Sequence, residues 1–235
     1  VMQTPPDITV AAPQPNELPW AAALTADMVL YAFDDDDADR LTLTVGVVGP
    51  WALGEQSQTL VHEAIGSDEP LGWDNQLDNE LVLRAEAARS RRMRLTGADG
   101  SMGTDLVLGA SGALGNLSSG AAASVVARVG RALETTHATV SLVPNRQVNP
   151  TVSGGRGIWY AFVGAELRFV ANDLLVQGNT FDDDGPGVTL DRTRVRVSLG
   201  ASADIGPVGI SLVYARFPGN IDDDAFGALA LTWRY

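Results

Sequence analysis

The residue best suited to chemistry in this sequence is His62, which lies in a segment with helical spacing of its apolar residues. Apolar side chains recur through residues 53–65 at helical intervals and Gly66 follows, so we expect a short helix there. Gln58 and His62 are four residues apart and point the same way from such a helix. An imidazole titrates near neutral pH and suits a general base. A single histidine on a helix is also a common structural residue, so both readings stay open.

A segment dense in amides and carboxylates follows this helix and leads into a predicted strand. It reads Gly-Trp-Asp-Asn-Gln-Leu-Asp-Asn-Glu over residues 72–80, and Trp73, Asn75 and Gln76 are its candidate site residues. The whole insert, residues 49–75, separates two strands, and an insertion of this length indicates a role of its own. We expect its helix to fold back into the interior of the protein.

Charged side chains gather in two further kinds of cluster. Arg89, Arg91, Arg92 and Arg94 crowd the end of one predicted strand, and guanidinium forks match the geometry of phosphate. Aspartate runs occupy residues 34–37, 182–184 and 222–224. Carboxylates are hard ligands that suit Ca²⁺ or Mg²⁺, although solvated loop tips are the more common explanation of such runs. The arginines bind an anionic ligand or pair with the acidic loops.

Composition excludes several classes of protein. The chain has 235 residues, with 16 Lys and Arg against 29 Asp and Glu, and its net charge of −13 argues against nucleic-acid binding. It has no cysteine, so disulfides, thiolate metal sites and cysteine nucleophiles are excluded. We find no Gly-x-Ser-x-Gly elbow, no phosphate-binding loop and no apolar run of about 18 residues that would predict a transmembrane helix.

Alternation of apolar and polar residues dominates the remainder of the chain. Between Thr193 and Ala203, for example, valine, leucine and alanine fill every second position, and arginine and serine fill most of the positions between them. The connections between these segments alternate between tight turns and longer loops. The predicted strands are residues 20–33, 39–48, 76–93, 102–115, 118–131, 157–170, 173–179, 189–203, 207–217 and 225–235.

This pattern predicts an all-β protein, a transmembrane antiparallel β-barrel of about ten strands. A soluble β-sandwich or lipocalin-like barrel would alternate as well. However, arginine and glutamate recur on one strand face and require a wet or internally paired lumen. We expect residues 1–235 to form a single outer-membrane barrel domain, with a helical, lumenal insert at 49–75.

The last strand resembles the assembly signal of bacterial outer-membrane proteins, which would place Tyr235 on the periplasmic side. Counting strands back from there predicts that residues 34–38, 94–101, 132–156, 180–188 and 218–224 lie outside, and that the insert begins at the periplasmic end. All three aspartate runs would then face the outer leaflet, where divalent ions bridge anionic glycolipids. Arg91 and Arg92 would lie nearby.

Several segments together form a pattern that covers nearly the whole chain. They are Gly49-Pro50, Gln58-x-x-x-His62, the 72–80 segment, Gly115-Asn116, residues 162–168, Gly178-Asn179-Thr180-Phe181 and residues 226–231. This pattern resembles the outer-membrane lipid A 3′-O-deacylase (LpxR-like) family. The resemblance implies a bacterial outer-membrane barrel that hydrolyses the 3′-linked acyl ester of lipid A, depends on Ca²⁺ and uses a histidine to activate water.

By this resemblance His62 takes the place of the catalytic histidine. Gln58, Trp73, Asn75 and Gln76 shape the site. Arg91 and Arg92 are candidates for substrate binding for a different reason, namely their expected place at the outer end of their strand, where their guanidinium groups could meet the phosphates of lipid A. The implied partners are lipid A or lipopolysaccharide and outer-membrane lipids, with no nucleic acid, and the protein is expected to be a monomer.

The sequence also departs from the family. The family's first two strands, which carry a Glu-Asn-Asp motif tied to the metal and a Tyr-Thr-Asn-Gly-like motif, have no counterpart here. Leu18 stands where the family has an arginine, and leucine cannot stabilise an oxyanion. These departures keep a second hypothesis open: a catalytically impaired or non-enzymatic barrel of the same ancestry, with a structural or glycolipid-binding role. A small pore is a third.

Overall fold

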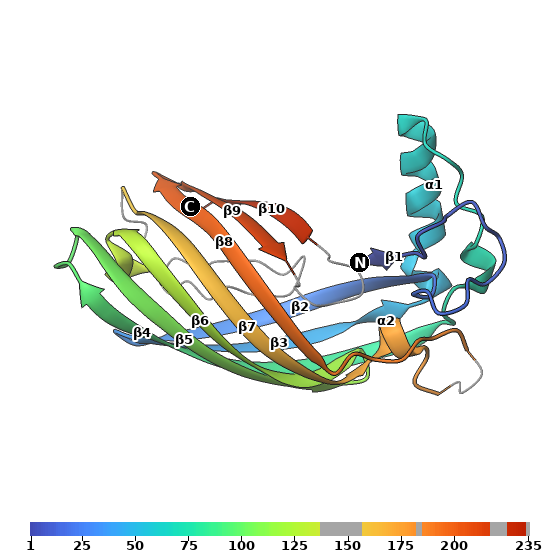
Figure 1. Ribbon diagram of the computed structural model, residues 1–235, viewed down its shortest axis with the longest axis horizontal. Helices are drawn as coiled ribbons and strands as arrows, with labels where there is room; N and C mark the ends of the chain where they lie inside the picture. Colours follow the sequence, from blue (N-terminus) through green and yellow to red (C-terminus); the bar gives the residue numbers. More distant parts are fainter. Residues whose placement is uncertain (137–156, 182–184, 217–224, 234–235) are drawn as a thin grey trace.

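The protein is one curled antiparallel β-sheet with a helix at one end, as the computed structural model shows (Figure 1). The structure describes residues 1–136, 157–181, 185–216 and 225–233. The strands are β1 Met2–Gln3, β2 Ala21–Phe33, β3 Asp37–Val48, β4 Glu80–Thr96, β5 Met102–Gly115, β6 Ser118–Arg131, β7 Trp159–Asp173, β8 Thr193–Ile205, β9 Val208–Arg216 and β10 Ala225–Trp233. The helices are η1 Pro50–Ala52, α1 Gly54–Ile65, η2 Trp73–Asn75, η3 Leu133–Thr135 and α2 Leu174–Gln177.

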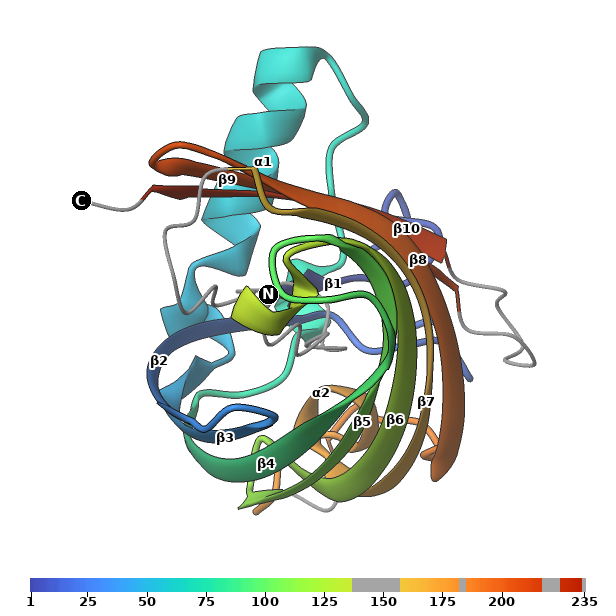
Figure 2. The same ribbon diagram turned by 90° about the vertical axis from the view of Figure 1, so that its left-hand side faces the viewer.

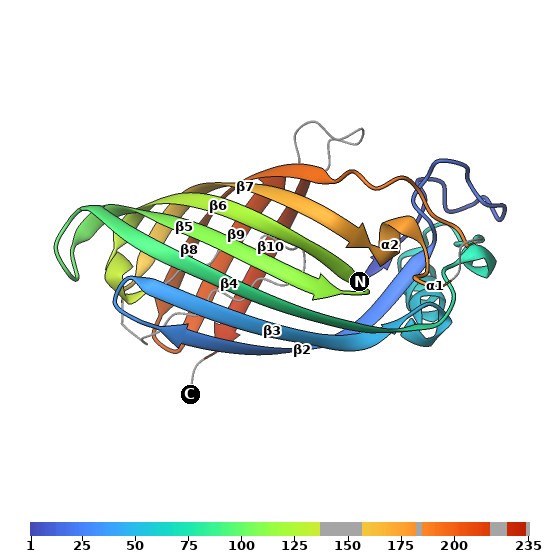
Figure 3. The ribbon, with the colours of Figure 1, turned by 90° about the horizontal axis from the view of Figure 1, so that it is seen from below.

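Each strand pairs with the next in the chain, in the order β1 to β10. The pairing is antiparallel throughout, with a register shift between Arg94 and Thr96 and another between Ser119 and Gly120. Figure 2, which looks along the strands, shows the sheet curling around a lumen, and Figure 3 shows the tilted strands of its wall. The all-β antiparallel fold predicted from the alternation is thus confirmed.

The wall has an apolar outer face and a polar inner face. On β4, Leu81 and Leu83 point outward and are 71% and 57% exposed, whereas Arg84 and Glu86 point inward and are 5% and 6% exposed. Side chains alternate across a strand, so each strand supplies both faces at once. The exposed outer leucines and valines suit a lipid environment, as in outer-membrane barrels. None of the described helices has the length and apolar composition to cross a membrane.

Ion pairs line the inner face, which is one of the two possibilities that the sequence left open. The guanidinium of Arg128 binds both carboxylate oxygens of Asp105, at 2.8 and 2.5 Å, and both side chains are almost fully buried. Arg196 binds Glu166 at 3.1 Å. Burying a charge costs several kcal/mol unless a partner compensates it, so these pairs are what makes a charged interior tolerable.

One predicted strand is wrong. Residues 173–179 form the short helix α2 and the turn after it, and the two-residue β1 takes their place in the ten-stranded order. The apolar run from Leu174 to Val176 is too short for periodicity to separate strand from helix. Packing decides the outcome, because Leu174 is buried in a cluster that includes Leu77 and Leu117, and Gly178 (φ 98°) ends the helix.

The missing strand changes which loops share an end of the sheet. The connection from β7 to β8 lies at the same end as the insert, where the Asn179 side chain hydrogen-bonds to Asp78. The β2–β3 turn at residues 34–36 lies at the other end, since Phe33 pairs with Ala38 there. The prediction that residues 34–38 and 180–188 share one end is therefore wrong. Asp182–Asp184, Asp222–Asp224, His137 and Tyr235 lie outside the described residues.

The insert also takes a different course from the one predicted. Its helix α1 does not fold back into the lumen but stands at the end of the sheet, across the direction of the strands (Figure 1). Leu60 and Ile65 on this helix are 68% and 70% exposed. The helix lacks enough buried apolar surface to serve as a core element, and it packs on the wall only through its first turns.

Candidate functional site

The site is built on α1, which begins and ends close to the predicted positions. Gly49 (φ 89°) turns the chain out of β3, and Leu53 adopts a left-handed conformation (φ 59°) directly before the helix. Gly66 (φ 69°) ends the helix and donates its backbone N–H to the carbonyl of His62. A left-handed glycine is the usual way to satisfy the last carbonyls of a helix. The helix predicted over 53–65 is confirmed.

Two tryptophans and a glutamine fix the base of α1. The indole Nε1 of Trp73 donates a 2.8 Å hydrogen bond to Oε1 of Gln58, and both side chains are buried. The ring of Trp73 meets that of Trp20 edge to face, with centroids 5.1 Å apart and planes at 61°. Such aromatic pairs contribute about 0.5–1.5 kcal/mol beyond their burial. Gln58 therefore orients the helix against the end of β2, as a residue that shapes the site would.

Two glycines allow the insert to pack closely against Trp20 and Ala22. A Cβ on Gly54 would lie 2.3 Å from Cβ of Ala22 and 2.7 Å from Cη2 of Trp73. A Cβ on Gly72 would lie 2.3 Å from Nε1 of Trp20. Neither glycine has a positive φ, so the requirement for glycine at both positions is one of space.

His62 lies one turn after Gln58 on α1 and is partly exposed. Its Nδ1 is 2.6 Å from the carbonyl oxygen of Asp68. A carbonyl only accepts, so Nδ1 carries the proton in the neutral ring and Nε2 keeps its lone pair. Within the described part of the chain, the His62 ring makes no hydrogen bond with the side chains of Gln58, Trp73, Asn75 or Gln76. The carbonyl of Asp68 thus sets the tautomer that a general base requires.

Asn75 and Gln76 line the same end of the sheet in different ways. The Asn75 amide donates to the carbonyl of Ala11 at 2.6 Å and so attaches the N-terminal segment to the insert. In that segment the pKa of Asp7 is lowered by hydrogen bonds from the side chain and the backbone N–H of Thr9. Oε1 of Gln76 is buried without a hydrogen-bond partner among the described residues. Of the predicted site-shaping residues, Gln58 and Trp73 are joined by a hydrogen bond between their side chains, and the backbone N–H of Gln76 donates to the carbonyl of Trp73 at 3.1 Å.

The sequence analysis did not single out Glu80, which joins three segments at this end. One carboxylate oxygen accepts from the Asn116 amide at 2.9 Å; the other accepts from the Thr180 backbone at 2.8 Å and the Asn179 amide at 3.2 Å. The sequence did carry a signal, because Gly115-Asn116 and Gly178-Asn179-Thr180 were part of the family pattern. Their separation along the chain hid the fact that they meet at one carboxylate.

Arg91 and Arg92 lie at the end of the sheet away from α1. Arg92 is buried and binds Asp36 at 2.9 Å and the carbonyl of Leu133 at 3.0 Å. Arg91 is exposed on the outer face, where its Nε is 3.9 Å from Asp37. The structure therefore pairs both arginines with the first aspartate run and does not bring them together with His62.

The described residues do not form a calcium site of the expected kind. They contain no group of three or more histidine, cysteine, aspartate or glutamate side chains placed to hold a metal ion. Calcium takes six to eight oxygen ligands, with carboxylates prominent among them. Leu18, in the place of the family's arginine, is 40% exposed.

A curled antiparallel sheet that is apolar outside and charged and ion-paired inside defines the class of outer-membrane β-barrel proteins. A model of the family "Outer membrane protein LpxR" matches residues 1–235, and the chain belongs to this family. The fold is similar to that of LpxR from Salmonella typhimurium, with a TM-score of 0.85 and 20% sequence identity over 100% of this chain and 80% of that chain. None of the curated proteins compared with the chain matches it.

Proposed function

We propose that this protein is an outer-membrane lipid A 3′-O-deacylase, a carboxylic ester hydrolase, with His62 as its general base. The observation that carries the proposal is the bond from His62 Nδ1 to the carbonyl of Asp68, because it leaves Nε2 as the basic nitrogen. Membership of the LpxR family supports the same substrate class, an acylated glycolipid in the outer membrane.

The chemistry follows from this tautomer. Nε2 of His62 takes a proton from a water molecule as the oxygen of that water bonds to the ester carbonyl carbon. The tetrahedral intermediate then collapses, the bond to the sugar oxygen breaks, and the imidazolium returns its proton to that oxygen. The products are a fatty acid and a glycolipid with a free 3′-hydroxyl. Gln58 and Trp73 act on this step only by holding α1 in place.

The corrected strand order supports the location of the site. If β10 runs toward the periplasm, as in outer-membrane barrels that end on their last strand, then β8 runs inward and β7 outward. Counting back through the observed strands puts α1 and the β7–β8 connection outside, and residues 34–36 on the periplasmic side. Lipid A occupies the outer leaflet, so His62 and the substrate would lie on the same side of the membrane.

A non-catalytic glycolipid-binding barrel is the second candidate. Leu18 removes a cation that would stabilise an oxyanion, and the described residues lack a metal-binding cluster. This candidate predicts that the protein retains glycolipid without cleaving it.

Mass spectrometry of lipid A from Gram-negative cells that express the protein separates the two. The enzyme hypothesis predicts loss of the 3′ acyl chain in cells with the unaltered protein and its retention with His62→Ala. Glu63→Ala, which alters the exposed neighbouring residue on α1, is the matched control and should cleave normally. Repeating the assay on purified protein with added calcium and then with a chelator tests the metal dependence. Intact lipid A in every sample would refute the enzyme hypothesis.

A further inference from the structure

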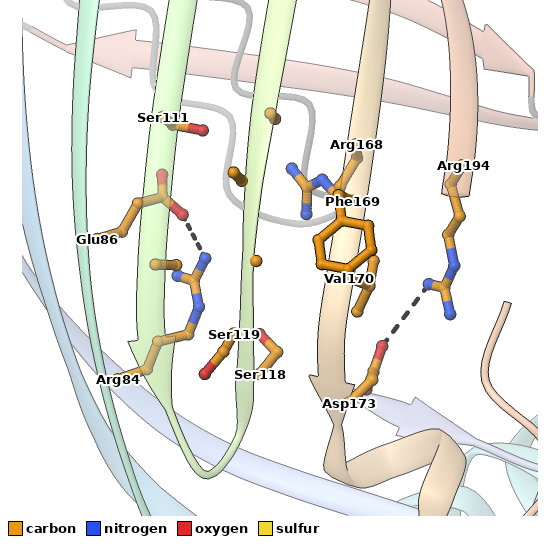
Figure 4. Close-up of a pocket in the computed structure, with 14 residues that line it drawn as sticks. Arg84, Glu86, Ser111, Ser118, Ser119, Arg168, Phe169, Val170, Asp173 and Arg194 are labelled. Atoms are coloured by element: carbon orange, nitrogen blue, oxygen red, sulfur yellow. Dashed lines mark hydrogen bonds and ion pairs between the residues drawn. The ribbon is translucent and has the colours of Figure 1, made fainter. Parts of the chain in front are cut away.

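A second polar pocket lies inside the sheet, away from His62, and the proposed function does not use it. It is lined by the inner faces of β4 to β8, near the β5–β6 turn (Figure 4). Three arginines contribute to it, Arg84, Arg168 and Arg194, together with the hydroxyls of Ser111 and Ser118. In Figure 4 the three guanidinium groups come from three different strands, with Arg168 between Arg84 and Arg194.

On the β4 side, two arginines share one carboxylate. Arg84 and Arg40 each contact one oxygen of Glu86, so a single negative charge serves two positive charges. Arg84 is 5% exposed, and its Nε has no hydrogen-bond partner among the described residues. A buried guanidinium therefore keeps an N–H donor that the ion pair does not satisfy.

The β7–β8 side repeats this arrangement. Arg168 and Arg196 both contact Oε1 of Glu166, at 3.3 and 3.1 Å. Arg194 lies 3.6 Å from Asp173, within ion-pair distance. The Arg168 and Arg194 side chains are 29% and 26% exposed, so they reach the open part of the pocket.

The lining of the pocket has a surplus of positive charge. Among the described residues that line it, the three arginines face two carboxylates, Glu86 and Asp173. This surplus sits inside a chain whose net charge is −13. Uncompensated cations in a partly buried site are unfavourable, and an anion that takes several charge-assisted hydrogen bonds offsets that cost.

We propose that this pocket is a binding site for an oxyanion of the phosphate class. Arg84, Arg168 and Arg194 supply forked donors, and Ser111 and Ser118 supply hydroxyls, which together match a tetrahedral group of oxygens. The ligand is either free phosphate or the phosphomonoester head group of a lipid. The proposal is independent of ester hydrolysis at His62, because the two sites share no residue.

Direct binding tests it with the full-length protein in detergent micelles. Equilibrium dialysis with radiolabelled inorganic phosphate, at constant ionic strength set with sodium chloride, should show one saturable site. Arg168→Gln and Arg194→Gln should each weaken binding about tenfold or more, since a hydrogen bond to a charged group contributes roughly 1.5–3 kcal/mol. Circular dichroism confirms that each variant keeps its strand content.

Arg131→Gln is the matched control, because it removes an exposed arginine at the end of β6 away from the pocket and should leave phosphate binding unchanged. Phosphatidic acid added to the micelles separates the two sources: displacement of the label indicates a lipid head group, and retention indicates a free oxyanion. Absence of saturable binding would overturn the proposal. So would binding that survives both Arg168→Gln and Arg194→Gln, or binding that falls equally with Arg131→Gln.

Discussion

Replacing Gly72 with alanine tests how tightly the insert is packed against the sheet. The added Cβ would lie 2.3, 2.5 and 2.7 Å from Nε1, Cε2 and Cζ2 of the Trp20 indole, far inside normal contact. Trp20 is 2% exposed and rests edge to face on Trp73, so the ring has no free space to move into. Gly72 itself has φ −101°, which alanine adopts without strain, so the effect should come from overpacking alone.

Overpacking of this kind costs about 1–3 kcal/mol. We expect the free energy of unfolding of Gly72→Ala to fall by that amount, measured by guanidinium unfolding in detergent micelles. In a thermal scan, each kcal/mol corresponds to roughly 2–4 °C in Tm for a domain of this size. Because Trp73 also positions Gln58 on α1, lipid A deacylation should fall together with stability.

Gly112→Ala on β5 is the matched control. A Cβ there meets no atom within 4 Å and needs no unusual backbone, so stability should change by less than about 0.5 kcal/mol. Trp20→Phe removes Nε1, the atom closest to the added methyl, so Gly72→Ala should cost less in that background, by an amount on the order of 1 kcal/mol. If Gly72→Ala proves as harmless as Gly112→Ala, the described contact between the insert and β2 is incorrect.

Three further substitutions test other contacts. Gln58→Ala leaves the buried indole N–H of Trp73 without its acceptor and should cost about 1–3 kcal/mol in chemical unfolding, whereas Gln58→Glu, which keeps an acceptor, should cost less. Arg128→Met leaves the buried carboxylate of Asp105 without its partner and should lower the free energy of unfolding by about 3–5 kcal/mol. Adding Asp105→Leu should recover much of that loss, and no recovery would contradict the ion pair. Glu80→Gln replaces one acceptor oxygen by a donor that faces backbone and amide N–H groups, so Tm should drop, and limited proteolysis should cut near residues 178–181 sooner; an unchanged cleavage pattern would argue against this junction.

Much of the wall followed from the sequence because alternation is a local property. A strand places successive side chains on opposite faces, so the arginines between the valines of β8 had to face inward if the valines faced outward. The same alternation predicted an interior that is either wet or ion-paired, and the ion pairs are what the structure shows. The helix over 53–65 was equally local, since its apolar spacing and Gly66 together define where it begins and ends.

Other features were decided by contacts between distant segments. Leu174 is buried against Leu77 and Leu117, and this packing turned a predicted strand into α2 and reversed the assignment of every earlier loop to an end of the sheet. A single misassigned strand has this effect because each strand reverses the direction of the chain.

The candidate site shows the same division. The sequence by itself determined which residue types were available: a histidine that can act as a general base, a glutamine one turn before it, and a run of amides after the helix. Only the tertiary structure decided that Gln58 binds Trp73, that Glu80 joins three segments, and that Arg92 pairs with Asp36 at the far end. Spacing along the chain fixes the direction of a side chain within its own element, whereas its partners depend on how the sheet curls.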